Sequence, residues 1–579
     1  MKIASFYLGH NANAAFYTPE TGYRIIELER YFKKRYFGLI DADNEKIISA
    51  LMDCLALAKK CWGIDNDFDV CVIGQEETKE KTQRKNMLAQ EVVVSKKYTA
   101  VHHHVAHISC AFAQSPFPKA LVISYDGGGS DGASKIILKE RGPGLHNSYL
   151  FLSSVLPPGK TFFVMRPSLN SSKTSDGAWH ACKHASWNFN LGIKYNSAAY
   201  PISQIKNNKG DPTSDLALAG KLMGLSAYGK NIPLLRHTLT EHFLGNSGNR
   251  VVVNPVRSPF RDFATCVPYE PALAINSLSG SGALDLAFNA QGAFEDAFEI
   301  AVRPHLFAAI EKGLPIVMTG GCSLNVLVNE RLRAEFHDKM FVAPNVDDGG
   351  LALGQLCEIL MPESAIDITY NGLPILDKED LPKAVKDYGA RKVTPSEVAK
   401  LCKDGKIIGI CTGDSEVGPR ALGNRSIICD PSYPKMKDIL NSKVKFREYF
   451  RPFAPFIREE RANEIFEIRE GGKPSANMKF MSFAPMVRPR WRDQLPAITH
   501  VDGTARLQTV TEDSHKLFND ILVEFEKLSD HGVLLNTSFN IKGLPILTRI
   551  SDALHILENT DIDLVYIEGY LFSKIGKKK

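Results

Sequence analysis

Three stretches of the chain share one pattern, in which β-branched, aromatic and other apolar residues lead into a turn of Gly, Asp or Asn and then into more small or apolar residues. The stretches are KIASFYLGHNANAAFY at 2–17, ALVISYDGGGSDGASKIIL at 120–138 and LPIVMTGGCSLNVLVNERL at 314–332. The first two predict a strand, a turn and a second strand, and the third predicts a strand, a turn and a helix. We therefore expect a mixed α/β protein.

The order of these stretches favours an arrangement in two halves. Two hairpins that each head one half of a domain are typical of a duplicated actin-like ATPase fold, in which both turns point into a cleft between two lobes. Unrelated hairpins in a mixed α/β protein are the alternative. We expect this first domain to span residues 1–365.

A second, smaller α/β domain is predicted at 393–579, after a linker at 366–392. The stretch MPESAIDITYNGLPILDKEDLP is polar and contains Pro and Gly, which favours a loop. Beyond it, TPSEVAKLCKDGKIIGIC predicts a helix with Thr394 as its N-cap, followed by a strand.

Composition narrows the class of protein but not its partners. A chain of 579 residues is long for a single core, and 44% hydrophobic with 23% charged residues is ordinary for a globular protein. The net charge of +5 permits an anionic ligand or a nucleic acid without arguing for either. The opening has no signal-peptide pattern, no stretch reaches the ~18 apolar residues of a membrane span, and the eleven cysteines form no C-x-x-C pair. These features predict a soluble, cytoplasmic protein with reduced thiols and no membrane partner.

The stretch VHHHVAHISCAF combines four histidines with apolar residues. His103 and His107 are four positions apart, so on a helix they share a face and can bind one metal ion. Asp126 ends an apolar strand before glycines, and Asp347 and Asp348 end another in MFVAPNVDDGG. Two His with one or two Asp and open positions predict a catalytic site for Fe, Mn or Zn. A solvated helix face that carries several histidines is the alternative.

The second domain concentrates cations in GPRALGNRS and NSKVKFREYFRPFAPF, where aromatic residues and prolines alternate with the charges. Arginine forks fix phosphate oxygens while apolar side chains shape walls, so these stretches favour a triphosphate pocket. An interdomain salt-bridge network is the alternative. Arg506 in VDGTAR, and Asn536 and Ser538 in LLNTSFN, can add contacts to a base, ribose or phosphate. The cations are Arg420, Arg425, Lys443, Lys445, Arg447 and Arg451.

Nine motifs in order resemble the ATP-dependent O-carbamoyltransferases of nodulation-factor and antibiotic biosynthesis, a family with phage DNA-modifying relatives. They are HHVAHISCAFAQSPF, YDGGGSDG, GKLMGLSAYG, TGGCSLNVLVN, DDGGLALG, GPRALGNRSI, VKFREYFRPFAP, VDGTARLQTV and NTSFNIKG. The resemblance implies a first domain like the metal-dependent transfer domain of tRNA threonylcarbamoylation. It also implies a second domain that converts carbamoyl phosphate and ATP, with Mg²⁺, to carbamoyl adenylate. An acceptor hydroxyl then takes the carbamoyl group at the metal site.

The resemblance also assigns residues. It implies that His103, His107, Asp126 and Asp347 bind the divalent ion, with iron first and manganese or zinc as alternatives. It places Gly321 and Asn325 on the motif that lines the transfer cleft, and His10 near the acceptor. The implied nucleotide contacts are Arg420, Lys445, Arg451, Arg506, Asn536 and Ser538.

Two departures and an open choice of acceptor remain. The family usually has a glutamate where this chain has Leu544, and the segment 167–215 does not follow the family pattern. As an insertion near the cleft mouth, this segment is expected to read the acceptor, with a tolerated surface loop as the alternative. The acceptor is expected to be either the 5-hydroxymethyl group of a modified cytosine in DNA, or a hydroxylated sugar or natural product. A tRNA threonylcarbamoyl transferase and a noncatalytic actin-like nucleotide switch are the rival functions.

Overall fold

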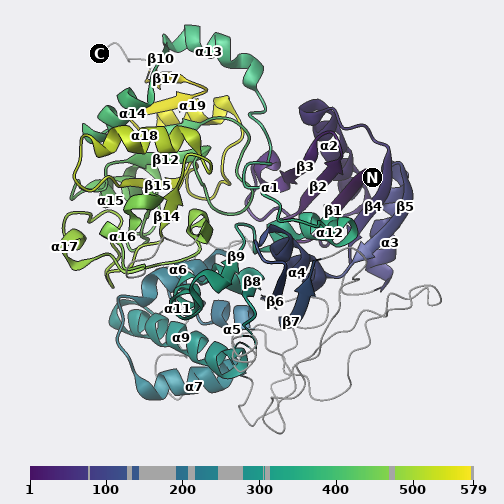
Figure 1. Ribbon diagram of the computed structural model, residues 1–579, viewed down its shortest axis with the longest axis horizontal. Coiled ribbons are helices and arrows are strands. Elements are labelled where there is room, and N and C mark those ends of the chain that lie inside the picture. The colour runs from purple at the N-terminus through teal and green to yellow at the C-terminus, as the bar shows by residue number, and fades with distance from the viewer. Residues whose placement is uncertain are drawn as a thin grey trace.

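The computed structural model places strands in three sheets (Figure 1). The residues that it describes are 1–75, 79–126, 134–141, 191–205, 216–244, 278–303, 306, 309, 313–468 and 476–574. The GGGSDG turn and most of the predicted acceptor-reading segment lie outside this described part.

The first sheet has the order β3-β2-β1-β4-β5, in which β2 runs antiparallel to both neighbours while β4 and β5 are parallel to β1. The predicted first hairpin is confirmed. Successive residues of β1 point to opposite faces, so Ala4 and Phe6 pack on one face with α2 and α3, and Ile3 and Tyr7 pack on the other with α4 and α12. The strands are β1 (Ile3–Tyr7), β2 (Asn13–Thr18), β3 (Gly22–Glu27), β4 (Phe68–Gly74) and β5 (Ser95–Val101). The helices are α1 (Leu28–Phe32), α2 (Asn44–Trp62), α3 (Lys79–Val92), α4 (His103–Gln114) and α12 (Leu351–Leu360).

The second sheet repeats this plan in the order β7-β6-β8-β9. Its hairpin partner β7 is antiparallel to β6, and β8 and β9 are parallel to β6, as β4 and β5 are to β1. In both sheets the last strand is followed by a helix, α4 after β5 and α12 after β9. The duplicated arrangement predicted for the first domain is therefore confirmed. The strands are β6 (Lys119–Tyr125), β7 (Ser134–Glu140), β8 (Ile316–Thr319) and β9 (Met340–Val342).

In Figure 1, α7 and α9 lie below the second sheet, and α6 and α11 lie beside it at the left. The third hydrophobic stretch forms β8, the 3₁₀ turn η2 and helix α11, as predicted. The elements are α5 (Leu191–Ser197), α6 (Leu218–Ser226), α7 (Pro233–Leu244), α9 (Gly280–Ala301), η2 (Gly321–Leu324), α11 (Val326–Phe336), η3 (His337–Lys339) and η4 (Asp348–Gly350).

The third sheet belongs to the second domain and has the order β10-β17-β16-β11-β12-β15-β13-β14. Thr394 caps α14 with a reciprocal bond to Glu397, so the predicted helix start is confirmed. The strands are β10 (Arg391–Lys392), β11 (Ile408–Cys411), β12 (Arg425–Cys429), β13 (Ala454–Arg458), β14 (Gln508–Val510), β15 (Leu534–Ser538), β16 (Leu564–Ile567) and β17 (Tyr570–Ser573). The helices are α13 (Leu381–Tyr388), α14 (Pro395–Lys403), α15 (Met436–Ile439), α16 (Ala462–Ile465), α17 (Pro489–Arg492), α18 (Lys516–Glu526) and α19 (Ile550–Asn559). Shorter turns are η5 (Lys378–Asp380), η6 (Leu440–Val444), η7 (Glu459–Arg461) and η8 (Ala476–Phe480).

The predicted linker 366–392 is not an open connection between the domains. Its last part forms α13 and β10, and β10 pairs with β17 of the third sheet. In its first part, Leu373 and Leu376 are buried against the core of the first sheet. These apolar residues lie within a mainly polar stretch, and the packing they gain outweighs its loop-like composition.

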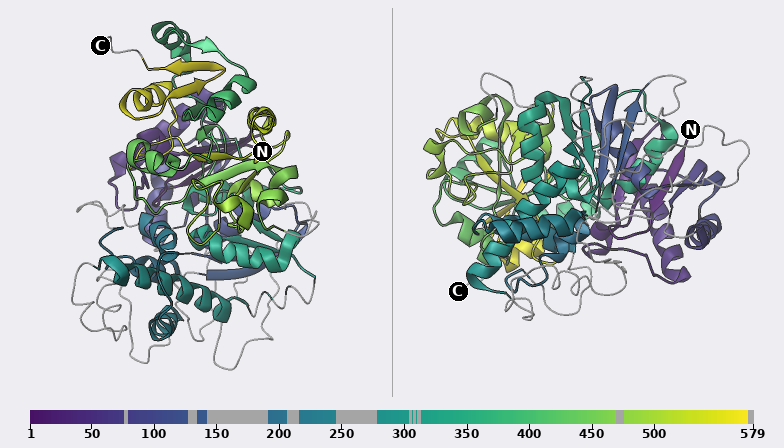
Figure 2. Two further views of the ribbon diagram at one scale, coloured as in Figure 1. Left: turned by 90° about the vertical axis from the view of Figure 1, so that its left-hand side faces the viewer. Right: turned by 90° about the horizontal axis from the view of Figure 1, so that it is seen from below.

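The second domain packs on both halves of the first. Arg24 Nη1 in the first half lies 3.3 Å from Asp414 Oδ2, and Asn329 Nδ2 in the second half donates to the backbone oxygen of Ser482 at 3.0 Å. The right-hand view of Figure 2 shows the second domain, in green and yellow, beside the teal half.

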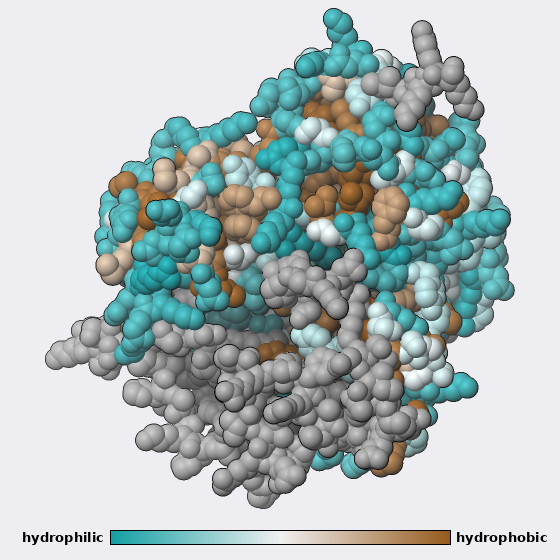
Figure 3. Space-filling model, turned by 180° about the vertical axis from the view of Figure 1, so that it is seen from behind, coloured by the Kyte–Doolittle hydropathy of each residue, from teal (hydrophilic) through white to brown (hydrophobic). Residues whose placement is uncertain are grey.

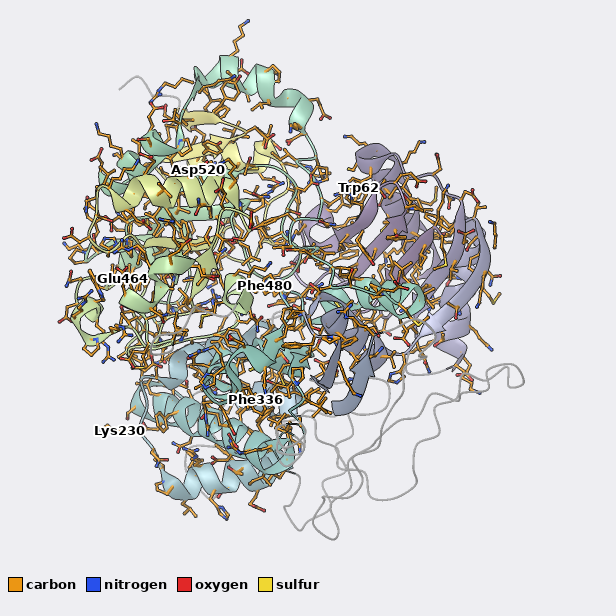
Figure 4. The ribbon with its side chains drawn as sticks, viewed as in Figure 1. Trp62, Lys230, Phe336, Glu464, Phe480 and Asp520 are labelled. Carbon is orange, nitrogen blue, oxygen red and sulfur yellow. The ribbon has the colours of Figure 1, made fainter. Side chains whose placement is uncertain are left out.

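Phe480 in η8 of the second domain lies where this domain meets the half of the first domain that contains the second sheet (Figure 4). Its ring centroid is 6.1 Å from that of Phe341 in β9. The described residues on the face drawn in Figure 3 are mostly hydrophilic, with apolar side chains exposed in separate patches. Among the described residues, no helix has the length and apolar character needed to span a bilayer.

Helices α4 and α12 cross between the two halves at a backbone contact that only glycine allows. Helix α12 packs on strands of the first sheet and α4 on strands of the second, and the two helices also pack on each other. A Cβ atom at Gly354 of α12 would lie 1.9 Å from the backbone oxygen of Ala106 in α4.

Substitution Gly354→Ala is therefore expected to lower the free energy of unfolding by about 2 kcal/mol, because the helices must separate to admit the methyl group. Urea unfolding measures this change. The matched control is Gly282→Ala in α9, where the nearest atom to an added Cβ is 3.8 Å away. That substitution should leave stability unchanged or raise it. Equal effects of the two substitutions would contradict the close contact.

Candidate active site

Two histidines and two carboxylates meet where the two halves join. His103 and His107 lie on one face of α4, Asp126 directly follows β6, and Asp348 opens η4 after β9. One ligand atom from each of the four residues lies within 4.8 Å of the others. The Nε2 atom of His103 is 3.1 Å from Asp126 Oδ2, and that of His107 is 3.3 Å from Asp348 Oδ1. The helix spacing seen in the sequence thus brings both imidazoles to carboxylates from two different strands.

The charges in this cluster depend on one another. Burial alone would favour neutral forms, but the facing histidines hold the pKa of Asp126 well below its usual range and that of Asp348 at about 2. Burial also opposes protonation of His107, yet the two carboxylates raise its pKa to about 10. The carboxylates therefore need positive charge beside them, whether from protons or from a metal ion.

The residues of the cluster fit a divalent metal ion. His107 is 1% exposed, and its Nε2 atom makes no hydrogen bond although it faces two carboxylates. Two imidazole nitrogens and two carboxylate oxygens that converge in this way form a ligand set suited to Fe, Mn or Zn. His103, His107, Asp126 and Asp348 would hold the ion.

The sequence analysis assigned Asp347 to this cluster, and the structure brings Asp348 there instead. The Oδ1 atom of Asp347 accepts a hydrogen bond from the backbone N–H of Gly349 at 3.2 Å and caps η4. Burial and the neighbouring Asp348 raise the pKa of Asp347 to about 6. The correction arises because the chain turns between two adjacent aspartates, and the sequence does not show which of them faces the helix.

Contacts from outside the cluster orient its two carboxylates. Tyr7 at the end of β1 donates its hydroxyl to Asp348 Oδ2 at 2.7 Å, and His10 Nε2 lies 3.2 Å from the same oxygen. The backbone N–H of Gly321 donates to Asp126 Oδ1 at 2.8 Å. The structure thus brings His10, which was expected near the acceptor, and Gly321, which was expected along the transfer cleft, into contact with the carboxylates of the cluster. Tyr7 was missed, and its only signal was its position at the strand end that leads into the same turn as His10.

A second cluster, of cations, lies in the second domain. Arg420 precedes β12, Lys445 follows η6, Arg506 precedes β14, and Asn536 and Ser538 lie on β15. All of the nucleotide contacts implied by the resemblance line one cavity of about 1150 Å³. They are Arg420, Lys445, Arg451, Arg506, Asn536 and Ser538, and Arg447 joins them.

These cations have too few carboxylate partners to balance their charge. Within the described residues, no carboxylate oxygen lies within 4.0 Å of Arg420, Lys445 or Arg506, whereas Arg451 has Glu448 at 3.7 Å. Burial and mutual repulsion lower the pKa of Lys445 and Arg506 well below their usual values, and burial lowers that of Arg420 to about 10. Such a cluster is suited to a polyanionic ligand.

Neutral polar groups also line the cavity beside these cations. Lys445 Nζ donates to the backbone oxygen of Ser538 at 2.6 Å. Asn536 donates from Nδ2 to Ala421 O at 3.1 Å, while its buried Oδ1 has no hydrogen-bond partner. Two cations that the sequence analysis placed in these stretches lie elsewhere. Arg425 is fully buried and donates to the backbone oxygen of Gly413, and Lys443 is exposed, with Asp561 at 3.3 Å.

The same cavity reaches the His–Asp cluster. Its lining includes His10, His103, Asp126 and Asp348 at one end and the cations at the other. Gly321 and Asn325, which the resemblance placed along the transfer cleft, also line it. Asn325 caps α11 and donates from Nδ2 to Gln291 at 3.1 Å. One cavity therefore contacts both clusters.

Comparison with known proteins agrees with this arrangement. The family model described as carbamoyltransferase C-terminus matches residues 399–574, the greater part of the second domain. Nodulation protein NolNO of Sinorhizobium fredii is 30% identical over 512 residues, which cover 85% of this chain and 66% of that protein. Nodulation protein U of Rhizobium tropici is 33% identical over 383 residues, covering 62% of each chain. The chain belongs to the carbamoyltransferase family.

This carbamoyltransferase-family chain spans less than two thirds of either nodulation protein. Two solved structures share weak likeness with it. HypF of T. kodakarensis has a TM-score of 0.32 and 12% identity, covering 62% of this chain and 47% of HypF. ADP-bound MreB5 of Spiroplasma citri has a TM-score of 0.30 and 9% identity, covering 67% of this chain and 98% of MreB5.

The geometry predicts different roles for the two adjacent aspartates of this carbamoyltransferase-family chain. Asp348→Asn is expected to weaken Mn²⁺ binding at least about tenfold, because it removes a charged ligand. Asp347→Asn, the matched control, should weaken it much less, because Asp347 caps a turn. Isothermal titration calorimetry measures both affinities. If Asp347→Asn had the larger effect, the assignment of Asp348 would be wrong.

Metal binding should also depend on pH. Because the carboxylates raise the pKa of His107 to about 10, the metal-free site holds a proton at neutral pH that the ion must displace. The Mn²⁺ affinity is therefore expected to rise from about pH 6 to about pH 9, with proton release seen as a buffer-dependent binding heat. An affinity that is constant over this range would contradict the proton-filled cluster.

Proposed function

We propose that this chain is an ATP-dependent O-carbamoyltransferase that works in two steps within one cavity. In the first step, water cleaves phosphate from carbamoyl phosphate, and the carbamate oxygen then attacks the α-phosphorus of ATP at the cation cluster, which gives carbamoyl adenylate and releases pyrophosphate. In the second, an acceptor hydroxyl attacks the carbamoyl carbon near the His–Asp cluster and AMP leaves. The observation that carries this proposal is the cavity of about 1150 Å³ that reaches both clusters.

The cation cluster supplies the charge that the first step needs. Negative charge builds on pyrophosphate as the adenylate forms, and buried donors stabilise such charge strongly. Arg420, Arg451 and Arg506 line the cavity with few carboxylate partners, so a bound triphosphate and its Mg²⁺ would relieve their repulsion. The partnerless Oδ1 of Asn536 offers an acceptor for a hydroxyl or amino group of the nucleotide.

The His–Asp cluster supports the second step. A divalent ion bound by His103, His107, Asp126 and Asp348 would supply a Lewis acid that stabilises charge on the carbonyl or phosphate oxygen. The Nε2 atom of His10 faces Asp348, and the half-exposed side chain lines the cavity, so this imidazole could exchange a proton with the acceptor hydroxyl. Because both clusters line the same cavity, the labile adenylate would pass between them without leaving the protein.

The cavity also has an apolar wall that is open to a ligand. Ile40, Ile193 and Leu216 line it although each is 41% exposed. Ile193 on α5 belongs to the described part, 191–205, of the segment that was expected to recognise the acceptor. This wall supports an acceptor whose hydroxyl is attached to a flat or apolar body. Both acceptor candidates meet that condition, hydroxymethylcytosine in DNA through its base and a hydroxylated sugar or natural product through its ring face.

Two substitutions should separate the two steps. His107→Ala is expected to abolish carbamoyl transfer while pyrophosphate release continues, because only the His–Asp cluster is changed. Arg420→Ala is expected to lower pyrophosphate release at least about a hundredfold, since it removes a buried cation from the developing charge. Both activities are measured with ATP, carbamoyl phosphate and Mn²⁺. If both variants lost or kept both activities together, the assignment of two sites would be wrong.

The same assay identifies the acceptor and tests the rivals. Hydroxymethylcytosine-containing DNA and a panel of sugars and natural products are offered in parallel, and a gain of one carbamoyl group is sought by mass spectrometry. A gain on DNA should be accompanied by salt-sensitive DNA binding. A threonylcarbamoyl transferase would instead consume threonine and bicarbonate, and a nucleotide switch would not respond to His107→Ala.

A further inference from the structure

Arg30 joins the first domain to the loop that carries Arg420. It lies in α1, is 2% exposed, and donates from Nη1 to the backbone oxygen of Glu416 at 2.7 Å. Its Nη2 donates to the backbone oxygen of Gly418, also at 2.7 Å. A guanidinium group is suited to this task because its fork of donors can hold two oxygens in fixed positions. Arg30 thus holds the backbone of Glu416 and Gly418, which lie four and two residues before Arg420.

Glu27 completes this grip from the same side. Its Oε2 atom lies 2.8 Å from Arg30 Nη2, and its Oε1 accepts a hydrogen bond from the backbone N–H of Gly418 at 3.3 Å. On the opposite side, a Cβ atom at Gly418 would lie only 2.6 Å from the backbone oxygen of Pro344. Gly418 also has φ +106°, a conformation that favours glycine. The segment is therefore enclosed between α1 and the chain that leads to Asp348.

Glu416 passes this constraint on to the cation cluster. Its buried carboxylate accepts hydrogen bonds at Oε1 from the backbone N–H groups of Leu422, Gly423 and Arg425, at 2.6, 3.2 and 3.3 Å. The loop is thereby closed around the carboxylate, with Arg420 between its two ends. The backbone oxygen of Ala421, next to Arg420, accepts the hydrogen bond from Asn536.

We propose that Arg30 is a positioning residue for the anion-binding end of the cavity, acting on Arg420 through the Glu416 loop. Arg30 itself is absent from the cavity lining, so its effect is indirect. The inference rests on the proposed function in one respect, that Arg420 binds phosphate groups. Beyond that function, the inference states that the first domain helps to shape the anion site of the second domain. The anion site is then correctly formed only while the two domains are docked.

A double-mutant cycle tests this inference. The full chain and its Arg30→Lys, Arg420→Ala and double variants are titrated with inorganic triphosphate in a calorimeter, after thermal melting has shown that each is folded. A lysine keeps the charge but cannot hold both backbone oxygens. Arg30→Lys is expected to weaken binding about tenfold in the native chain and less than about twofold in the Arg420→Ala background.

The matched control is Arg24→Lys. Arg24 also reaches from the first domain to the second, with Nη1 3.3 Å from Asp414, but it has no bond to the loop from 416 to 425. It should leave triphosphate affinity unchanged. If Arg30→Lys does not fold, Glu27→Gln replaces it, with an expected loss of about threefold that also disappears without Arg420.

The outcomes separate this inference from the proposed function. Unchanged binding in Arg30→Lys, or in Glu27→Gln where it replaces Arg30→Lys, would overturn the inference while triphosphate binding by the native chain still supports the anion site. The same loss in both backgrounds, or an equal loss in Arg24→Lys, would show a general structural effect and would also overturn it. A native chain that binds no triphosphate would overturn both.

Discussion

The pairing of two buried carboxylates with two imidazoles, at the junction of two duplicated sheets, is the constraint on which this structure depends. Asp126 and Asp348 come from different halves, and His103 and His107 come from the helix that crosses between them. Buried carboxylates are costly without positive partners. The halves must therefore meet in one register, and the close contact of α4 with α12 at Gly354 helps to set it.

The opposite charge imbalance lies at the other end of the same cavity. There the cations Arg420, Lys445 and Arg506 have no carboxylate within 4.0 Å in the described part of the chain. An acidic cluster that suits a metal ion and a basic cluster that suits a polyanion thus share one space. The separation of opposite charges within one cavity supports two chemical steps that share it. Arg30 of the first domain holds the Glu416 loop at the cationic end.

Local sequence patterns predicted much of this arrangement because they depend on local physics. Apolar runs that lead into turns of Gly, Asp or Asn predicted both hairpins, and the capping residue Thr394 predicted the start of α14. The spacing of His103 and His107 predicted their shared face. Tertiary contacts were beyond such patterns. Whether Asp347 or Asp348 faces α4 depends on one turn, and nothing in the sequence of Tyr7 or Arg30 shows which distant backbone each contacts. The cation-rich stretches and the family motifs both pointed to the expected nucleotide contacts, and their convergence in one cavity required the fold.

A crystal structure of the full chain with Mn²⁺ and a non-hydrolysable ATP analogue tests the central claim most directly. The account predicts anomalous density for Mn²⁺ between His103, His107, Asp126 and Asp348, and the triphosphate among Arg420, Lys445, Arg451 and Arg506, in one continuous cavity. Nucleotide bound instead between the β1–β2 and β6–β7 turns of the duplicated domain, with the second-domain cations unoccupied, would contradict the two-step account and favour an actin-like nucleotide switch.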